Sequence, residues 1–133
     1  MLKLFIIDDD PLSRMLIREM LIDTDIVIIE SDCGTKALDI FARHSKEIGL
    51  ILLDIKLPDC DGWILSADIR EVDPEIPIIA TSALTPNELE GKYREALLTG
   101  YITKPFDMNR LREIIQCYLH IEFDWNSKQH SNF

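Results

Sequence analysis

The chain has 133 residues, 47% of them hydrophobic and 29% charged, which is the composition of one soluble globular domain. No apolar run reaches the roughly 18 residues that a membrane-spanning helix needs. A formal net charge of −10 argues against direct binding of DNA or RNA, because an acidic surface repels phosphates.

The N-terminus, MLKLFIIDDD, has no small-residue cleavage site after its short apolar run, which argues against a secretory signal peptide. The three cysteines, Cys33, Cys60 and Cys117, form no CxxC pair and no disulfide framework. We expect free thiols in a reducing cytoplasm, and therefore a cytoplasmic protein. The lack of a long apolar run predicts that the protein does not associate with membranes.

Five short apolar segments alternate with longer amphipathic ones. The strands are predicted at residues 3–7 (KLFII), 26–29 (IVII), 50–54 (LILLD), 77–81 (PIIAT) and 101–103 (YIT). Their consecutive apolar positions are typical of strands that are covered on both faces of a sheet.

Helix signals lie between these strands. Asp10 is a predicted N-cap followed by Pro11 at the first helical position. Residues 85–88 (TPNE) form a capping box, although Gly91 weakens the helix that would follow. The last helix carries an apolar stripe at helical spacing, made of Leu111, Ile114, Ile115, Tyr118 and Leu119.

A strand–helix unit repeated five times predicts an α/β fold with a doubly wound parallel sheet, right-handed crossovers and helices on both faces. We expect one domain over residues 1–120. Residues 121–133 have no clear periodicity and are expected to form a short flexible tail.

Polar residues follow the predicted strands. Asp8 and Asp9 come after the first strand, Asp54 ends the third, Thr81 and Ser82 end the fourth, and Lys104 follows the fifth. Ligands of open parallel sheets collect at the carboxyl ends of the strands, so these residues are expected to share one rim.

Three carboxylates on one rim would repel one another unless a cation lay between them. Magnesium prefers oxygen ligands and combines carboxylates with water and phosphate oxygens. A lysine would pair with a phosphoryl oxygen, and a carboxylate is a known nucleophile that forms an aspartyl phosphate. The sequence therefore predicts a magnesium-dependent site that phosphorylates an aspartate.

Four segments, IIDDDP, LILLDIKLPDCDGW, IIATSAL and YITKPFD, occur in the order and at the spacing found in one family. Over residues 1 to about 120 the chain resembles the response-regulator receiver domains of two-component signalling. The resemblance implies the flavodoxin-like strand order 2-1-3-4-5.

The resemblance also implies the roles of individual residues. Asp54 is the phosphoacceptor; Asp8, Asp9, Asp54 and the backbone carbonyl of Lys56 hold Mg²⁺, with Mn²⁺ as a possible substitute. Lys104 pairs with the phosphoryl group, assisted by the hydroxyl of Ser82 and the amide of Ala83. Tyr101 is the switch aromatic, and the Lys104–Pro105 peptide bond is expected to be cis.

By the same resemblance, a sensor histidine kinase or a phosphotransfer protein donates the phosphoryl group from a phosphohistidine. The change then passes to the face of the fourth helix, fifth strand and fifth helix, which binds an unknown protein target. We expect a signalling switch rather than an enzyme, as a monomer or a weak phosphorylation-dependent dimer. The chain departs from the family at Leu97, where glycine is common, and at Lys56, which places a long cation beside the phosphoacceptor.

The main alternative is a phosphatase of the haloacid-dehalogenase type, in which Asp8 is the nucleophile and Asp10 the acid–base. Leu12 stands where that motif has a small hydroxyl residue or valine, and Asp54 would have no role. A flavodoxin-like electron carrier is disfavoured because three acids replace the hydroxyls that bind the flavin phosphate. A receiver that never accepts phosphate is disfavoured by the complete set of acids, hydroxyl and lysine.

Overall fold

A computed structural model of the chain describes residues 2–83 and 98–120. The predicted capping box at 85–88, Gly91, Leu97 and the predicted tail at 121–133 lie outside the described residues. The elements in chain order are β1 (Lys3–Ile7), α1 (Pro11–Met20), β2 (Ile28–Ser31), α2 (Gly34–His44), the short 3₁₀ helix η1 (Ser45–Glu47), β3 (Ile48–Asp54), α3 (Gly62–Val72), β4 (Ile78–Ser82), β5 (Gly100–Thr103) and α5 (Met108–Leu119).

The five strands form one parallel sheet in the order β2-β1-β3-β4-β5, which confirms the predicted fold class and strand order. This order places β1 and β3 next to each other in the centre of the sheet. Both strands are therefore covered by helices on either side, which agrees with their unbroken apolar sequences.

The predicted bounds of two strands were wrong by two residues. β2 begins at Ile28 rather than at residue 26, and it continues through Glu30 to Ser31, which lies opposite Ile7 of β1. β3 begins at Ile48 rather than at residue 50. Backbone pairing with β1 sets both bounds, whereas hydropathy alone favoured the apolar part of each segment.

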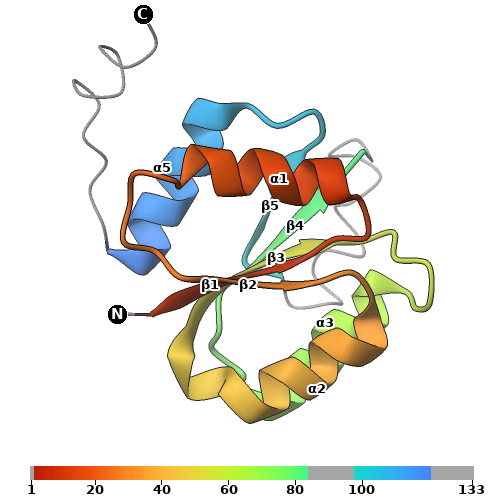
Figure 1. The fold of residues 1–133 in the computed structure, drawn as a ribbon. Helices are drawn as coiled ribbons and strands as arrows, with labels where there is room; N and C mark the ends of the chain where they lie inside the picture. Colours follow the sequence, from red (N-terminus) through yellow and green to blue (C-terminus); the bar gives the residue numbers. More distant parts are fainter. Residues whose placement is uncertain (1, 84–97, 121–133) are drawn as a thin grey trace, which may run out of the picture.

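Helices cover both faces of the sheet, with α1 and α5 on one side and α2 and α3 on the other (Figure 1). Alternate residues of β1 divide between these two layers. Leu4 and Ile6 belong to the core cluster that contains the buried residues of α1 and α5, whereas Phe5 and Ile7 belong to the cluster that contains those of α2 and α3. The period of two along the strand thus builds two cores on one sheet.

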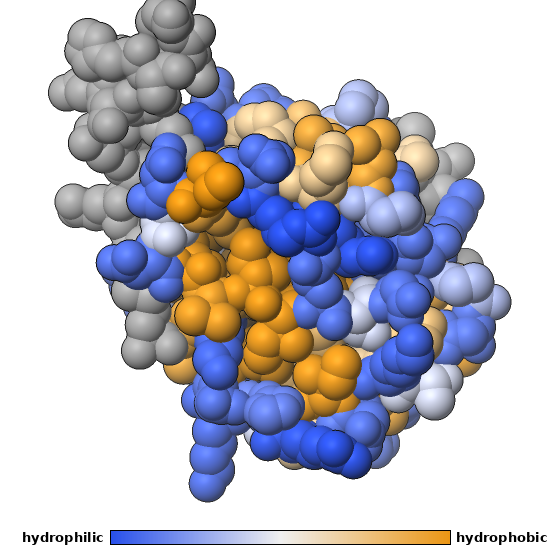
Figure 2. Space-filling model, viewed as in Figure 1, coloured by the Kyte–Doolittle hydropathy of each residue, from blue (hydrophilic) through white to orange (hydrophobic). Residues whose placement is uncertain are grey.

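The edge of the sheet at β2 carries apolar side chains that are not fully covered. Ile22 and Val27, just before β2, are exposed, and Ile28 and Ile29 are half-buried. Figure 2 shows an apolar area over this edge of the sheet, between α1 and α2. Among the described helices, none has the length and apolar content needed to cross a membrane.

Asp10 is the N-cap of α1, as the sequence predicted, with Pro11 at the first helical position. Its Oδ1 accepts a hydrogen bond of 2.9 Å from the Leu12 amide, and its Oδ2 accepts one of 3.2 Å from the Ser13 hydroxyl. The cap thus satisfies one backbone N–H group that has no partner within the helix. It also fixes the point where the chain turns from β1 into α1.

The Asp10→Ala substitution is expected to lower the free energy of unfolding by about 1 kcal/mol, because the first turn of α1 loses its side-chain acceptor. Asp10→Asn is the matched control, since asparagine caps about as well as aspartate, and it should stay close to wild type. Urea unfolding followed by circular dichroism measures both. Equal losses in the two variants would show that charge, rather than capping, is the contribution of Asp10.

Candidate functional site

The candidate site lies at the carboxyl ends of β1, β3 and β5. Asp8 and Asp9 directly follow β1, Asp54 is the last residue of β3, and Lys104 directly follows β5. Because all five strands are parallel, their carboxyl ends lie at one rim of the sheet. Residues more than 90 positions apart in the sequence, such as Lys104 and Asp8, therefore meet there. The predicted grouping of the acids with Lys104 is therefore present.

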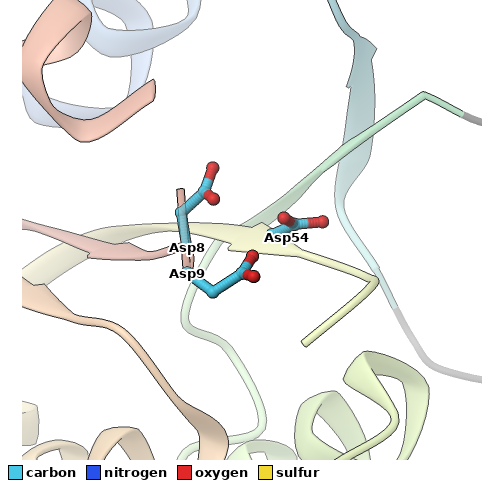
Figure 3. Close-up of side chains that lie close together, drawn as sticks. All are labelled: Asp8, Asp9 and Asp54. Atoms are coloured by element: carbon cyan, nitrogen blue, oxygen red, sulfur yellow. The ribbon is translucent and has the colours of Figure 1, made fainter. Parts of the chain in front are cut away.

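Three carboxylates surround one small space. One carboxylate oxygen from each of Asp8, Asp9 and Asp54 lies within 4.8 Å of the other two, and Figure 3 shows the three side chains gathered from the ends of β1 and β3. Asp8 is 2% exposed and Asp54 6%, whereas Asp9 is exposed. The group thus combines two buried carboxylates with one that is open to water.

Lys104 supplies the positive charge that faces the two buried acids. Its Nζ donates to Asp8 Oδ2 at 2.9 Å and to Asp54 Oδ2 at 3.3 Å. The same ammonium lies 5.9 Å from the centre of the Phe106 ring. Three carboxylates and one ammonium carry a formal charge of −2, so a divalent cation would balance the charge of the group.

Burial dominates the electrostatics of Asp54. It raises the pKa of Asp54 to about 6, against the hydrogen bond from the Lys56 amide and the charge of Lys104, which both act to lower it. Burial also acts to lower the pKa of Lys104, but the hydrogen bonds and charges of Asp8 and Asp54 outweigh it, so this pKa is raised. Lys104 therefore remains an ammonium, while Asp54 is costly to ionise without a further cation.

The loop after Asp54 is held in a tight turn. The Lys56 amide donates to Asp54 Oδ1 at 3.0 Å, and Lys56 pairs with Asp61 across the turn as an antiparallel bridge. The Gly62 amide donates to the Ile55 carbonyl at 3.0 Å. A Cβ on Gly62 would lie 2.7 Å from that carbonyl oxygen, so only glycine fits where the turn closes.

Ser82 and Thr81 are both buried at the end of β4. Thr81 lies opposite Asp54 of β3 in the sheet register, and Ser82 lies opposite Thr103 of β5. The Ser82 carbonyl accepts a hydrogen bond of 2.8 Å from the Lys104 amide, which joins the ends of β4 and β5. Both hydroxyl residues therefore end the strand that lies between β3, which carries Asp54, and β5, which precedes Lys104.

The remaining predicted site residues lie on or beside β4 and β5. Ala83 directly follows β4 and is exposed, and Tyr101 of β5 is half-buried against the core that contains α2 and α3. The peptide bond between Lys104 and Pro105 is cis.

The sequence did not predict the contacts of three residues near the site, of which Arg14 contacts a site residue directly. Arg14 of α1 donates to the Asp8 carbonyl, and Glu30 of β2 accepts from Arg14. Asp59 accepts from the Gly34 and Thr35 amides at the start of α2 and from the Thr35 hydroxyl, and the Gly34 amide bond is the main reason that the pKa of Asp59 is lowered to about 2. These contacts join different elements, so no local sequence pattern could have revealed them.

The comparisons with known proteins decide the family. The family model described as the response regulator receiver domain matches residues 4–116, which is most of the chain. The chain belongs to the response regulator receiver domain family. The fold, the strand order and the position of the acidic group in this chain agree with that membership, which supports a role in two-component signalling.

Relatives of the same length and longer ones both match this receiver. It is 29% identical to the chemotaxis protein CheY of Bacillus subtilis over 114 residues, which cover 85% of this chain and 93% of CheY. It is 31% identical to the polar-differentiation response regulator DivK of Brucella anthropi, over 86% of this chain and 93% of DivK. It is 28% identical to the sensor histidine kinase CheAY of Helicobacter pylori, over 89% of this chain and 15% of that protein.

A solved structure of similar fold is the receiver domain of the sensor histidine kinase PA1611 from Pseudomonas aeruginosa, which has a magnesium ion coordinated in its active-site cleft. The TM-score is 0.78 at 24% identity, over 90% of this chain and 98% of that one. The phosphatase alternative is not favoured, because the family match points to receivers and Asp10, its candidate acid–base, caps α1.

Proposed function

We propose that this receiver accepts a phosphoryl group on Asp54 from a phosphohistidine and changes its protein contacts as a result. The observation that carries the proposal is the meeting of Asp8, Asp9 and Asp54 around one space, with Lys104 bonded to the two buried acids. The same residues include the nucleophile, the candidate metal ligands and the cation that the reaction needs.

The donor set suits Mg²⁺, with Mn²⁺ as a possible substitute. The carboxylates of Asp8, Asp9 and Asp54 and the backbone carbonyl of Lys56 would hold the ion, all of them the oxygen ligands that hard cations prefer. When bound, the ion neutralises charge on the phosphoryl oxygens and on the carboxylates. Among residues 2–83 and 98–120, Lys104 alone forms ion pairs with the two buried acids, and this shortage of positive charge calls for a second cation.

The chain's own residues position the reaction. An Asp54 carboxylate oxygen forms a bond to phosphorus while the bond from phosphorus to the donor imidazole nitrogen breaks. The Lys56 amide holds the other Asp54 oxygen at 3.0 Å, which orients the carboxylate. Lys104 pairs with a phosphoryl oxygen, and the Ala83 amide and Ser82 hydroxyl donate to the others.

The added charge is proposed to act through Ser82 and Tyr101. Ser82 moves toward the phosphoryl group, Tyr101 turns inward behind it, and the face that contains β5 and α5 changes its affinity for a protein target. Tyr101 is half-buried against the core cluster that contains residues of α2 and α3, close to the end of β5. The response is a shift between two populated states.

The phosphodonor is proposed to be a sensor histidine kinase or a phosphotransfer protein. The relatives include sensor kinases such as CheAY of Helicobacter pylori and LuxN of Vibrio harveyi, which contain a region similar to this chain. Leu12, Met15 and Leu16 are exposed at helical spacing on α1, directly after the acidic loop. This apolar face is well placed to dock a donor beside Asp54.

We further propose that the receiver comprises residues 1–120, acts in the cytoplasm as a monomer or weak phosphorylation-dependent dimer, and is a switch rather than a turnover enzyme. A switch takes up one phosphoryl group for each molecule and releases it slowly. A phosphatase would instead release phosphate continuously from an excess of substrate.

Incubation with acetyl phosphate, followed by intact-mass measurement, tests the proposal. With magnesium the wild-type protein should gain the mass of one phosphoryl group, and with a chelator it should gain none. Absence of any mass gain in magnesium would contradict the proposed acceptor. Continuous phosphate release without a stable mass gain would instead favour the phosphatase.

A further inference from the structure

Asp8 is fixed through its backbone as well as through its side chain. Its amide donates to the Ser31 carbonyl of β2 at 3.0 Å, and its carbonyl accepts a hydrogen bond of 2.5 Å from Arg14 Nη1. The side chain accepts from the Asp10 amide at 2.9 Å through Oδ1, and from Lys104 through Oδ2. Of these four contacts, only the one with Arg14 comes from a side chain of α1. The proposed reaction gives Arg14 no role.

Arg14 is itself held in place by Glu30. Arg14 Nε donates to Glu30 Oε1 at 3.1 Å while its Nη1 reaches the Asp8 carbonyl, so the planar guanidinium bridges β2 and the end of β1. The Arg14 side chain is 19% exposed and that of Glu30 28%. Arg18, one helical turn further on, pairs with the same Glu30 oxygen at 2.5 Å and is more exposed.

We propose that Arg14, oriented by Glu30, is a positioning residue that sets the Asp8 carboxylate for binding a divalent cation. The inference rests on the proposed function, because it takes Asp8 as a cation ligand. Removal of a residue that holds a metal ligand in place, without contacting the metal, typically lowers the metal affinity by about 10- to 100-fold. Arg14 meets that description, since it contacts the Asp8 backbone and not the space between the carboxylates.

The geometry of arginine is essential to this role. Its fork places two N–H groups in fixed directions, so one residue donates to Glu30 and to the Asp8 carbonyl at the same time. Lysine keeps the charge but has no such planar fork. Glu30 also offsets the positive charge that Arg14 would otherwise bring close to a cation ligand.

The test measures Mn²⁺ affinity from the electron paramagnetic resonance signal of free Mn²⁺, at constant ionic strength. Arg14→Ala and Arg14→Lys should each raise the dissociation constant about 10-fold or more. Arg18→Ala is the matched control, because it removes a charge that pairs with Glu30 but does not contact Asp8, and it should stay within about twofold of wild type. Urea unfolding of each variant separates lost affinity from lost stability.

A second measurement needs no metal. The Asp10 amide donates to Asp8 Oδ1, so hydrogen exchange at this amide in chelator reports how firmly the Asp8 carboxylate is held. Arg14→Ala should speed its exchange, and Arg18→Ala should not. If Arg14→Ala does not fold, Arg14→Lys is the variant that decides both measurements.

Wild-type Mn²⁺ affinity in the Arg14 variants, or equal weakening by Arg18→Ala, would overturn the role of Arg14. A wild-type protein that binds no Mn²⁺ would overturn the proposed cation site, and with it the assignment of Arg14 to that site. Unchanged Asp10 exchange in the Arg14 variants would show that the contact does not position Asp8, whatever the metal affinity.

Discussion

The Asp54→Asn variant is expected to show no mass gain after incubation with acetyl phosphate and magnesium, whereas the wild type gains one phosphoryl group. The amide of asparagine is not a nucleophile for phosphorus, and the other acids of the site remain in place. Asp54 lies at the end of β3, where one carboxylate oxygen accepts a hydrogen bond from the Lys56 amide and the other from Lys104. Neither Asp8 nor Asp9 has this pair of hydrogen bonds.

The control for this experiment is Asp10→Asn, which keeps the cap of α1 and removes the acid–base of the phosphatase alternative. This variant should gain the same mass as the wild type. A mass gain that survives in Asp54→Asn would place the acceptor elsewhere. Loss of the gain in Asp10→Asn, with the protein still folded, would bring the phosphatase alternative back.

Magnesium is expected to stabilise the wild-type protein at pH 8 and to stabilise Asp54→Asn less. At a concentration 100 times its dissociation constant, a ligand that binds only the folded state adds about 2.7 kcal/mol to the free energy of unfolding. The variant retains Asp8 and Asp9 but has lost one of the three carboxylates, so its affinity and its gain are smaller. Urea unfolding with magnesium and with chelator measures both gains.

In chelator the Asp54→Asn variant should be more stable than the wild type, by an amount that depends on pH. Burial raises the pKa of Asp54 from 3.8 to about 6, so folding favours the protonated carboxyl. The stabilisation from this proton is complete below pH 3.8 and is lost as the pH rises through 6. At pH 8, metal-free Asp54→Asn should therefore exceed the wild type by about 1–2 kcal/mol, after allowance for screening by water and Lys104.

The difference in chelator should become small at pH 4, where Asp54 in the folded wild type is protonated. Because the two proteins share every other titrating group, their difference isolates Asp54. A difference that does not change between pH 4 and pH 8 would show that Asp54 ionises without cost. Equal stabilisation of the two proteins by magnesium would show that the ion binds without the Asp54 carboxylate.

Much of the fold could be predicted because its signals are local in the sequence: apolar strand segments, helix N-caps and the polar residues that follow the strands. The apolar run of residues 3–7 matches β1, and Asp10 with Pro11 marks the start of α1. The rule that parallel strands share one carboxyl edge then predicts that Asp8, Asp54 and Lys104 lie together.

The bounds of β2 and the contacts that hold Asp8 in place could not be predicted in this way. Glu30 lies in β2 because it pairs with Ile6 of β1, although its side chain is polar. Arg14 reads as an ordinary surface residue of an amphipathic helix, and only the packing of α1 beside β2 directs it to the Asp8 carbonyl. Asp59 likewise meets Gly34 because the loop after β3 approaches the start of α2.

The most direct test of the central claim is a crystal structure of this receiver grown with magnesium and beryllium trifluoride, which mimics a phosphoryl group on a carboxylate. We predict the mimic bound to an Asp54 oxygen, the magnesium ion coordinated by Asp8, Asp9 and Asp54, and Lys104 paired with a fluorine. A pocket without the mimic or the ion at saturating concentrations, with Lys104 still bonded to Asp8 and Asp54, would contradict the claim.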